Sequence, residues 1–146
     1  MSTRRHDGSL FYLLKHAQLR LADLTGPALA PFGITGRQCA VLIAIDEQAP
    51  SSQHDIAQRM GVDRTTMVTL VDELEGKGLV ERRPDPRDRR KNVVALTEAG
   101  RVTLRGATEA ADEAERSFLA ALSDEQAATF RELLRATVFP AAVTAD

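Results

Sequence analysis

The most chemically distinctive stretch of the chain is a cluster of charged residues between positions 82 and 91. Six basic residues stand there against two acidic ones, Asp85 and Asp88, which leaves a balance of +4. The basic residues are Arg82, Arg83, Arg87, Arg89, Arg90 and Lys91. Cationic side chains gathered on one constrained loop are suited to phosphate contacts, so the cluster favours nucleic-acid binding over a merely solvated loop.

A second set of candidate residues lies on one face of a predicted helix that starts after Asp63. This face combines an arginine with short hydroxyl side chains: Arg64, Thr65, Thr66 and Thr69. Hydroxyls at the start of a helix reach phosphates or base edges, and arginine binds guanine bidentately, so the set is suited to the DNA major groove. An ordinary solvated face capped by Asp63 is the alternative, and the basic cluster that follows favours DNA.

The elements that must position these residues have local signatures. Ser52 and Asp55 predict a capping box, and Gly61 predicts the end of that short helix and a tight turn into the next. Two alternating stretches, near 79–83 and 92–96, predict strands that flank the basic cluster, while Pro84 and Pro86 constrain the loop between them. We therefore expect a winged helix-turn-helix lobe at 35–97.

Outside the lobe, the sequence predicts helices whose apolar faces the lobe is too small to cover. A first helix is expected within 9–32, ended or kinked at Gly26-Pro27, and two more within 98–140, the longer one reaching about Leu122. The last helix has a long apolar stripe: Phe130, Leu133, Leu134, Val138 and Phe139. We expect these helices to form a dimer interface as an intertwined bundle, within a mainly α single domain, 1–146, that carries a small β wing.

Composition excludes several classes of protein. Only 4% of the residues are aromatic and there is no Trp, which argues against single-strand binding by base stacking. The net charge is −2, and residues 109–146 carry −5, so the acidic end should point away from any DNA. No catalytic constellation, metal-ligand spacing or cofactor motif appears, and the longest apolar run, Cys39 to Ile45, is too short for a membrane span. We predict a cytoplasmic protein that is not an enzyme and needs no cofactor or metal.

The single cysteine, Cys39, allows two interpretations. A free cysteine in an apolar segment is most often a small buried hydrophobic residue. The alternative is a thiol that senses oxidants, which requires a reactive, accessible sulfur.

The stretch VDRTTMVTLVDELEGKGLVERRPDPRDRRKNVVALTEAG, with its flanking helices, resembles the MarR family of bacterial transcriptional regulators. The resemblance implies a homodimer that binds a pseudo-palindromic operator, with Arg90 in the minor groove and Asp88 orienting it. Arg64, Thr65, Thr66 and Thr69 match the major-groove positions. Repression, relieved by a small phenolic or anionic ligand, is the implied function, while a winged-helix protein-interaction module remains the alternative.

The resemblance also implies a ligand cleft between the dimerisation helices and the DNA-binding lobe. His16 and Arg20 are four residues apart on the first helix and so share a face, with Phe11 and Tyr12 near. These four residues are the candidate ligand site, and a solvated helix face is the alternative. Cys39 stands where the family often has an aromatic residue, which keeps the oxidant-sensing hypothesis open.

Overall fold

The computed structural model describes residues 8–141, so the outermost parts of the predicted domain, 1–7 and 142–146, lie outside the described residues. Its helices and strands follow the predicted order. They are α1 (Leu10–Leu29), η2 (Ala30–Phe32), α2 (Gly36–Glu47), α3 (Gln53–Met60), α4 (Arg64–Gly76), β1 (Val80–Pro84), β2 (Asn92–Leu96), α5 (Glu98–Phe118) and α6 (Asp124–Val138). The predicted fold class, mainly α with a small β wing, is confirmed.

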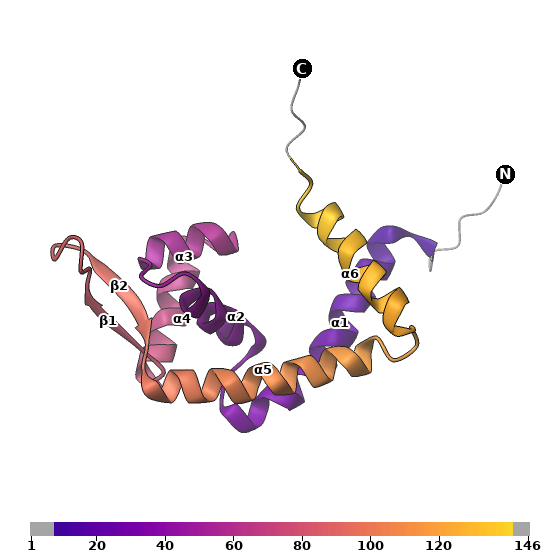
Figure 1. Ribbon diagram of the computed structural model, residues 1–146, viewed down its shortest axis with the longest axis horizontal. Coiled ribbons are helices and arrows are strands. Elements are labelled where there is room, and N and C mark those ends of the chain that lie inside the picture. The colour runs from indigo at the N-terminus through magenta and orange to yellow at the C-terminus, as the bar shows by residue number, and fades with distance from the viewer. Residues whose placement is uncertain (1–7, 142–146) are drawn as a thin grey trace, which may run out of the picture.

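The long helix α5 joins two unlike ends of the molecule (Figure 1). One end carries α2, α3, α4 and the two-stranded wing, and the other carries α6 and the first part of α1. Helix α1 packs along α5, and α5 also contacts α2 and β2. The helix-turn-helix with its wing and the candidate dimerisation helices are therefore held apart by a continuous helix and not by a loose linker.

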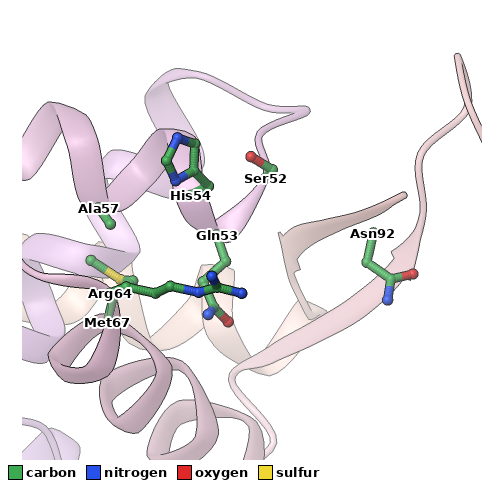
Figure 2. A pocket seen from close by; sticks show the side chains of 7 residues that line it. All are labelled: Ser52, Gln53, His54, Ala57, Arg64, Met67 and Asn92. Atoms are coloured by element: carbon green, nitrogen blue, oxygen red, sulfur yellow. The ribbon is translucent and has the colours of Figure 1, made fainter. Parts of the chain in front are cut away.

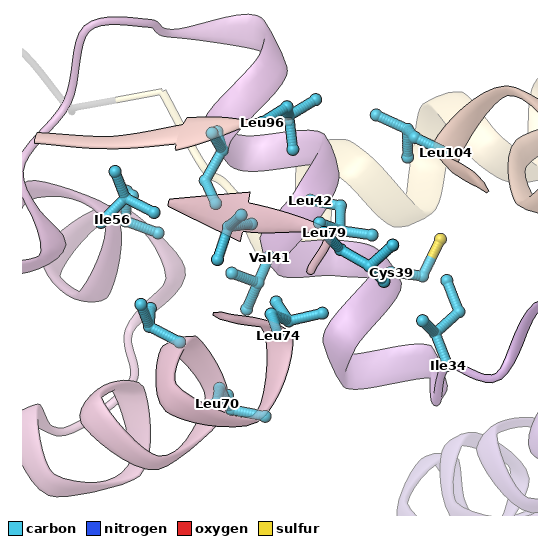
Figure 3. Packing of buried hydrophobic residues seen from close by; sticks show 14 of the residues in the cluster. Ile34, Cys39, Val41, Leu42, Ile56, Leu70, Leu74, Leu79, Leu96 and Leu104 are labelled. Carbon is cyan, nitrogen blue, oxygen red and sulfur yellow. The ribbon is translucent and has the colours of Figure 1, made fainter. Parts of the chain in front are cut away.

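The lobe has a closed hydrophobic core (Figure 3). Side chains from α2, α3, α4 and the wing are almost completely buried in it, among them Leu42, Ile56, Met67, Leu74 and Val80. Burial of large aliphatic side chains is the main stabilising contribution to a domain of this size. The core of the lobe extends without a break to Leu29 of α1 and to Leu104 and Ala107 of α5.

The predicted capping box at Ser52 and the predicted cap at Asp63 are confirmed, and further caps form at Thr35, Thr97 and Ser123. Capping boxes form at Thr35, Ser52 and Ser123, where each side chain accepts from the third helical amide and the residue there bonds back. Asp63 caps α4 and Thr97 caps α5 in the same way, without the reciprocal bond. These bonds join residues three apart, which is why the sequence alone predicts them.

Of the two outcomes predicted for Gly26-Pro27, an end of the helix is wrong, because α1 continues through Pro27 to Leu29. A proline removes one helical hydrogen bond, but packing of α1 along α5 and burial of Leu29 favour continuation.

Among the residues described, no single helix is long and apolar enough to cross a membrane. Only the pair Leu10–Phe32 and Gly36–Glu47, taken together, meets that length and composition, and this pair is bent by 70°.

Helix α5 also ends earlier than predicted, at Phe118 and not at Leu122. The amide of Leu122 donates to the carbonyl of Leu119 at 2.9 Å, so a turn replaces the last helical residues. This turn reverses the chain into α6, whose Arg131 pairs with Glu115 of α5 at 2.7 Å.

The wing is an antiparallel pair in which Arg82 lies opposite Val94 and Pro84 opposite Asn92. Its second strand is tied to the loop before α3, because the Val94 amide donates to the Ser51 carbonyl at 3.0 Å. This bond places the base of the wing beside the helix-turn-helix.

Candidate nucleic-acid interface

The tip of the wing presents Arg90 to solvent while holding it in one orientation. Asp88 accepts from the Arg90 amide and Nε, both at 3.1 Å, and from Nη2 at 3.3 Å. The Arg90 side chain nevertheless remains 91% exposed. A fork-shaped cation that is both exposed and oriented loses less conformational entropy when it binds an anionic groove.

The same arrangement occurs three residues earlier, at Asp85, which from the sequence is only a negative charge among the basic residues. Asp85 accepts from the Arg87 amide at 2.9 Å and from Arg87 Nε at 3.3 Å. Its own amide donates to the Lys91 carbonyl at 2.7 Å, which closes the loop. The signal for this was present in the sequence, because Asp-x-Arg occurs twice in succession within DPRDRR.

Both aspartates are stabilised as carboxylates by these bonds. The pKa of Asp88 is lowered first by the side-chain hydrogen bond from Arg90 and then by the Arg90 amide. The pKa of Asp85 is lowered first by the Arg87 amide and then by its side chain. The wing turn is therefore in its bonded form throughout the neutral pH range.

The other basic residues of the wing divide into two groups. Arg83, Arg89 and Lys91 are exposed, although Arg83 also pairs with Glu81 at 2.9 Å. Arg82 instead faces α4 and pairs with Asp72 at 2.6 Å. The prediction listed all of them together, and the structure separates Arg82 from the rest.

The start of α4 presents Arg64 and Thr65 to solvent. Thr66 has a different local role, because its amide and its hydroxyl both donate to Asp63, at 2.9 and 2.6 Å. The Thr69 hydroxyl donates to the Thr65 carbonyl at 3.2 Å. The hydroxyl protons of Thr66 and Thr69 thus serve the helix, which leaves their oxygens and methyl groups for any contact with a base edge.

A hollow of about 310 Å³ lies where α3, α4 and β2 converge. Figure 2 shows the Arg64 side chain extending toward Gln53, with Asn92 on the opposite side. Polar side chains of three elements therefore border one concave surface. The helix start and the wing form one continuous candidate interface.

Three comparisons with known proteins agree with this geometry. A sequence profile of the MarR family matches residues 32–91. The transcriptional regulator HosA of Escherichia coli O111:H- is 31% identical over 118 residues, which cover 81% of this chain and 80% of HosA. A MarR-family transcriptional regulator from Rhodococcus sp. RHA1 superposes with a TM-score of 0.85 at 32% identity, covering 95% of this chain and 99% of that one. This chain belongs to the MarR family.

Further members of the MarR family extend the comparison to bound partners and to function. The repressor CouR bound to a 23-mer DNA duplex is 31% identical, with a TM-score of 0.85, and the match covers 94% of this chain and 98% of that one. The repressor NicR of Pseudomonas putida is 34% identical over 93 residues, 64% of this chain and 59% of NicR. The resemblance stated from the wing and the LTEAG motif is confirmed.

The four candidate ligand residues of this MarR-family chain have different surroundings. Tyr12 and His16 stack with their ring centroids 3.9 Å apart, and His16 Nδ1 lies 2.9 Å from the Tyr12 carbonyl oxygen. Arg20 instead lies over the ring of Phe118 in α5, at 5.6 Å, and Phe11 is 79% exposed. The structure thus brings together one pair of the four.

Cys39 lies within the core of the lobe, only 4% exposed (Figure 3). Burial raises the pKa of its thiol, which lowers the fraction of reactive thiolate at neutral pH. Within residues 8–141, no group of three or more His, Cys, Asp or Glu side chains is arranged to hold a metal ion. The environment of Cys39 matches the packing interpretation.

Proposed function

We propose that the chain is a homodimeric transcriptional regulator that binds double-stranded DNA sequence-specifically, acts as a repressor in the cytoplasm and has no catalytic activity. The observation that carries the proposal is the exposed Arg90 fork, oriented by Asp88, beside the exposed start of α4. The DNA-bound relative CouR supports it, because the similarity covers both elements.

The two parts of the interface have different tasks. Arg64 and Thr65 at the start of α4 contact the major groove, with the methyl groups and oxygens of Thr66 and Thr69 beside them. Arg90 enters the adjacent minor groove, whose negative potential attracts a guanidinium group. Arg83, Arg87, Arg89 and Lys91 contribute sequence-independent attraction to phosphates.

The homodimer is supported by the apolar side chains that the single chain leaves uncovered. Leu10 and Phe11 of α1, Leu133 of α6 and Phe139 just after α6 are all exposed. Two chains that cover these faces place two copies of α4 on one side of the dimer. The operator is then a pseudo-palindrome with half-sites roughly 10 base pairs apart, centre to centre.

Release by a small phenolic or anionic ligand completes the proposal. A structural relative, CouR from Rhodococcus jostii RHA1, is described bound to p-coumaroyl-CoA and is 33% identical, with a TM-score of 0.82. In this chain the stacked pair Tyr12–His16 and the cation Arg20 are the candidate contacts on α1. An aromatic anion has a stacking partner and a counter-charge on this helix.

Fluorescence anisotropy with the promoter adjoining the gene tests DNA recognition. We expect tight binding to that duplex and weak binding to a scrambled duplex of the same length at moderate salt. Equal affinity for both would refute sequence-specific regulation and favour a protein-interaction module. Ligand release is tested by adding a panel of aromatic carboxylates and their CoA thioesters to the preformed protein–DNA complex. Arg20→Ala should raise the ligand concentration that is needed to release the DNA.

A further inference from the structure

Arg82 differs from the other basic residues of the wing in where its side chain goes. Its exposed fraction is 28%, against 91% for Arg90 at the tip. The guanidinium turns back from β1 onto the helix-turn-helix. Arg82 is therefore not presented to a ligand in the way the tip is.

One guanidinium serves three acceptors on two helices. Arg82 Nη2 donates to Asp72 of α4 at 2.6 Å and to Gln53 of α3 at 3.0 Å, and Nη1 lies 3.1 Å from a carboxylate oxygen of Glu75. Asp72 and Glu75 are three residues apart and so share one face of α4. The planar fork of arginine suits this set of acceptors, whereas a lysine ammonium presents a single point charge.

These bonds lie at the level where the wing leaves the lobe. Arg82 is paired with Val94, and the Val94 amide is bound to Ser51 on the other side of the sheet. Val80 and Leu96, nearer the lobe, are buried in the core, while Arg83 and Asn92, nearer the tip, are exposed. The sheet is thus held from two sides at the level of Arg82 and Val94, and Val93 is buried one position closer to the tip.

We propose that Arg82 is a positioning residue and not a DNA contact: by joining β1 to α4 and α3, it sets the spacing between the major-groove helix and the minor-groove arginine. This inference rests on the proposed function, since that spacing matters only if both elements bind one DNA site. Specific binding requires both contacts in register, whereas non-specific binding depends on net charge alone. Loss of Arg82 therefore reduces specificity more than general affinity.

Asp72→Asn gives the sharpest test, because a positioning role and a DNA-contact role predict opposite changes in operator affinity. If Arg82 positions the wing, the substitution weakens operator binding about tenfold while affinity for a scrambled duplex is unchanged or slightly higher. If Arg82 is a DNA contact restrained by Asp72, freeing it tightens binding to both duplexes and overturns the proposal. Glu81→Gln is the matched control, since it removes the acidic partner of another wing arginine, Arg83, leaves the partners of Arg82 in place and should shift both affinities equally.

Arg82→Met and Arg82→Lys separate the roles further. A positioning role predicts that both lose operator affinity and that neither changes the dependence of binding on salt. A phosphate contact predicts that Arg82→Lys retains affinity and that Arg82→Met lowers the slope of log K against log salt by about 1.8 per dimer. The second pattern would overturn the proposal. Melting temperatures within a few degrees of the unsubstituted protein show that each variant is folded.

Amide hydrogen exchange of the protein alone, without DNA, tests whether Arg82 holds the wing in place. In both Arg82→Met and Asp72→Asn, amides of residues 83–91 should exchange faster, while those of α2 keep their protection. Unchanged exchange in the wing would overturn the proposal. Should the unsubstituted protein fail to discriminate its promoter from a scrambled duplex, the proposed function fails, and the exchange experiment still reports whether Arg82 holds the wing.

Discussion

The lobe and the outer helices of this chain use apolar residues in opposite ways. In the lobe, Leu42, Ile56 and Leu74 are buried within one chain. In α6, the apolar side chains of Phe130, Leu133 and Val138 remain exposed, and none of the helix's residues is buried. The first pattern belongs to a core that is completed within one chain, and the second to half of an interface. Stability and assembly should therefore be separable by substitution.

The largest effect is expected from Leu133→Asp in α6. Leu133 is 63% exposed in the single chain, so the carboxylate costs little there, but it would be buried in the proposed dimer. We expect a monomeric protein whose operator binding is weakened by about 3 kcal/mol or more. Light scattering and anisotropy measure the two effects. Ala128→Asp, on the opposite face of α6, is the control and should leave the dimer intact; a dimeric Leu133→Asp would contradict the interface.

A large effect on the lobe is expected from Gly100→Ala at the start of α5. A Cβ at this position would clash with the carbonyl oxygen of Leu79, which is backbone and cannot rotate away. We expect the free energy of unfolding to fall by about 3 kcal/mol, as in an overpacked core. Gly76→Ala is the matched control, because no atom lies within 4 Å of its added Cβ, and it should stabilise α4 by up to about 1 kcal/mol. Urea denaturation distinguishes the two.

Arg90→Ala should affect DNA binding and neither stability nor assembly. The side chain is exposed and its loss leaves no cavity, so unfolding should change by less than about 0.5 kcal/mol. Operator binding should weaken by about 1–3 kcal/mol, with a shallower salt dependence. Arg105→Ala, an exposed arginine of α5, is the control and should change operator affinity little. Intact operator binding by Arg90→Ala would favour the protein-interaction alternative.

A smaller effect is expected from pH at the wing. Because the folded-state pKa values of Asp85 and Asp88 lie below the ordinary value of 3.8, their stabilising bonds are fully present above that value. The contribution is lost as pH falls through the lowered folded-state values. NMR chemical shifts of the Arg87 and Arg90 amides should thus be constant from neutral pH to about 5. A transition in those shifts near neutral pH would contradict the bonded form.

The smallest effect is expected from Cys39→Ser combined with peroxide treatment. Cys39 is buried and the pKa of its thiol is raised, so oxidation of the folded protein should be slow. Operator binding before and after brief treatment should be equal for the unsubstituted protein and the variant. Weakened binding only in the protein that retains the thiol would restore the oxidant-sensing hypothesis.

The sequence by itself determined the features that depend on near neighbours along the chain. The caps at Ser52, Asp63 and Thr97 join residues three apart, and the wing strands follow from alternation and two prolines. The Asp88–Arg90 pair spans two residues and was expected from the family resemblance. Such bonds form whenever the local backbone forms, so the fold class and most of the candidate DNA interface were predictable.

Tertiary structure alone decided the direction of side chains whose partners are distant in sequence. In the sequence, Arg82 is one of six neighbouring basic residues. Only the fold brings it to its acceptors on α3 and α4, which are 29 and 10 residues away along the chain. Packing along α5 carries α1 through Pro27 and brings the ring of Phe118 against Arg20. Periodicity predicts which face of an element is buried, but the partner on that face depends on how the helices pack.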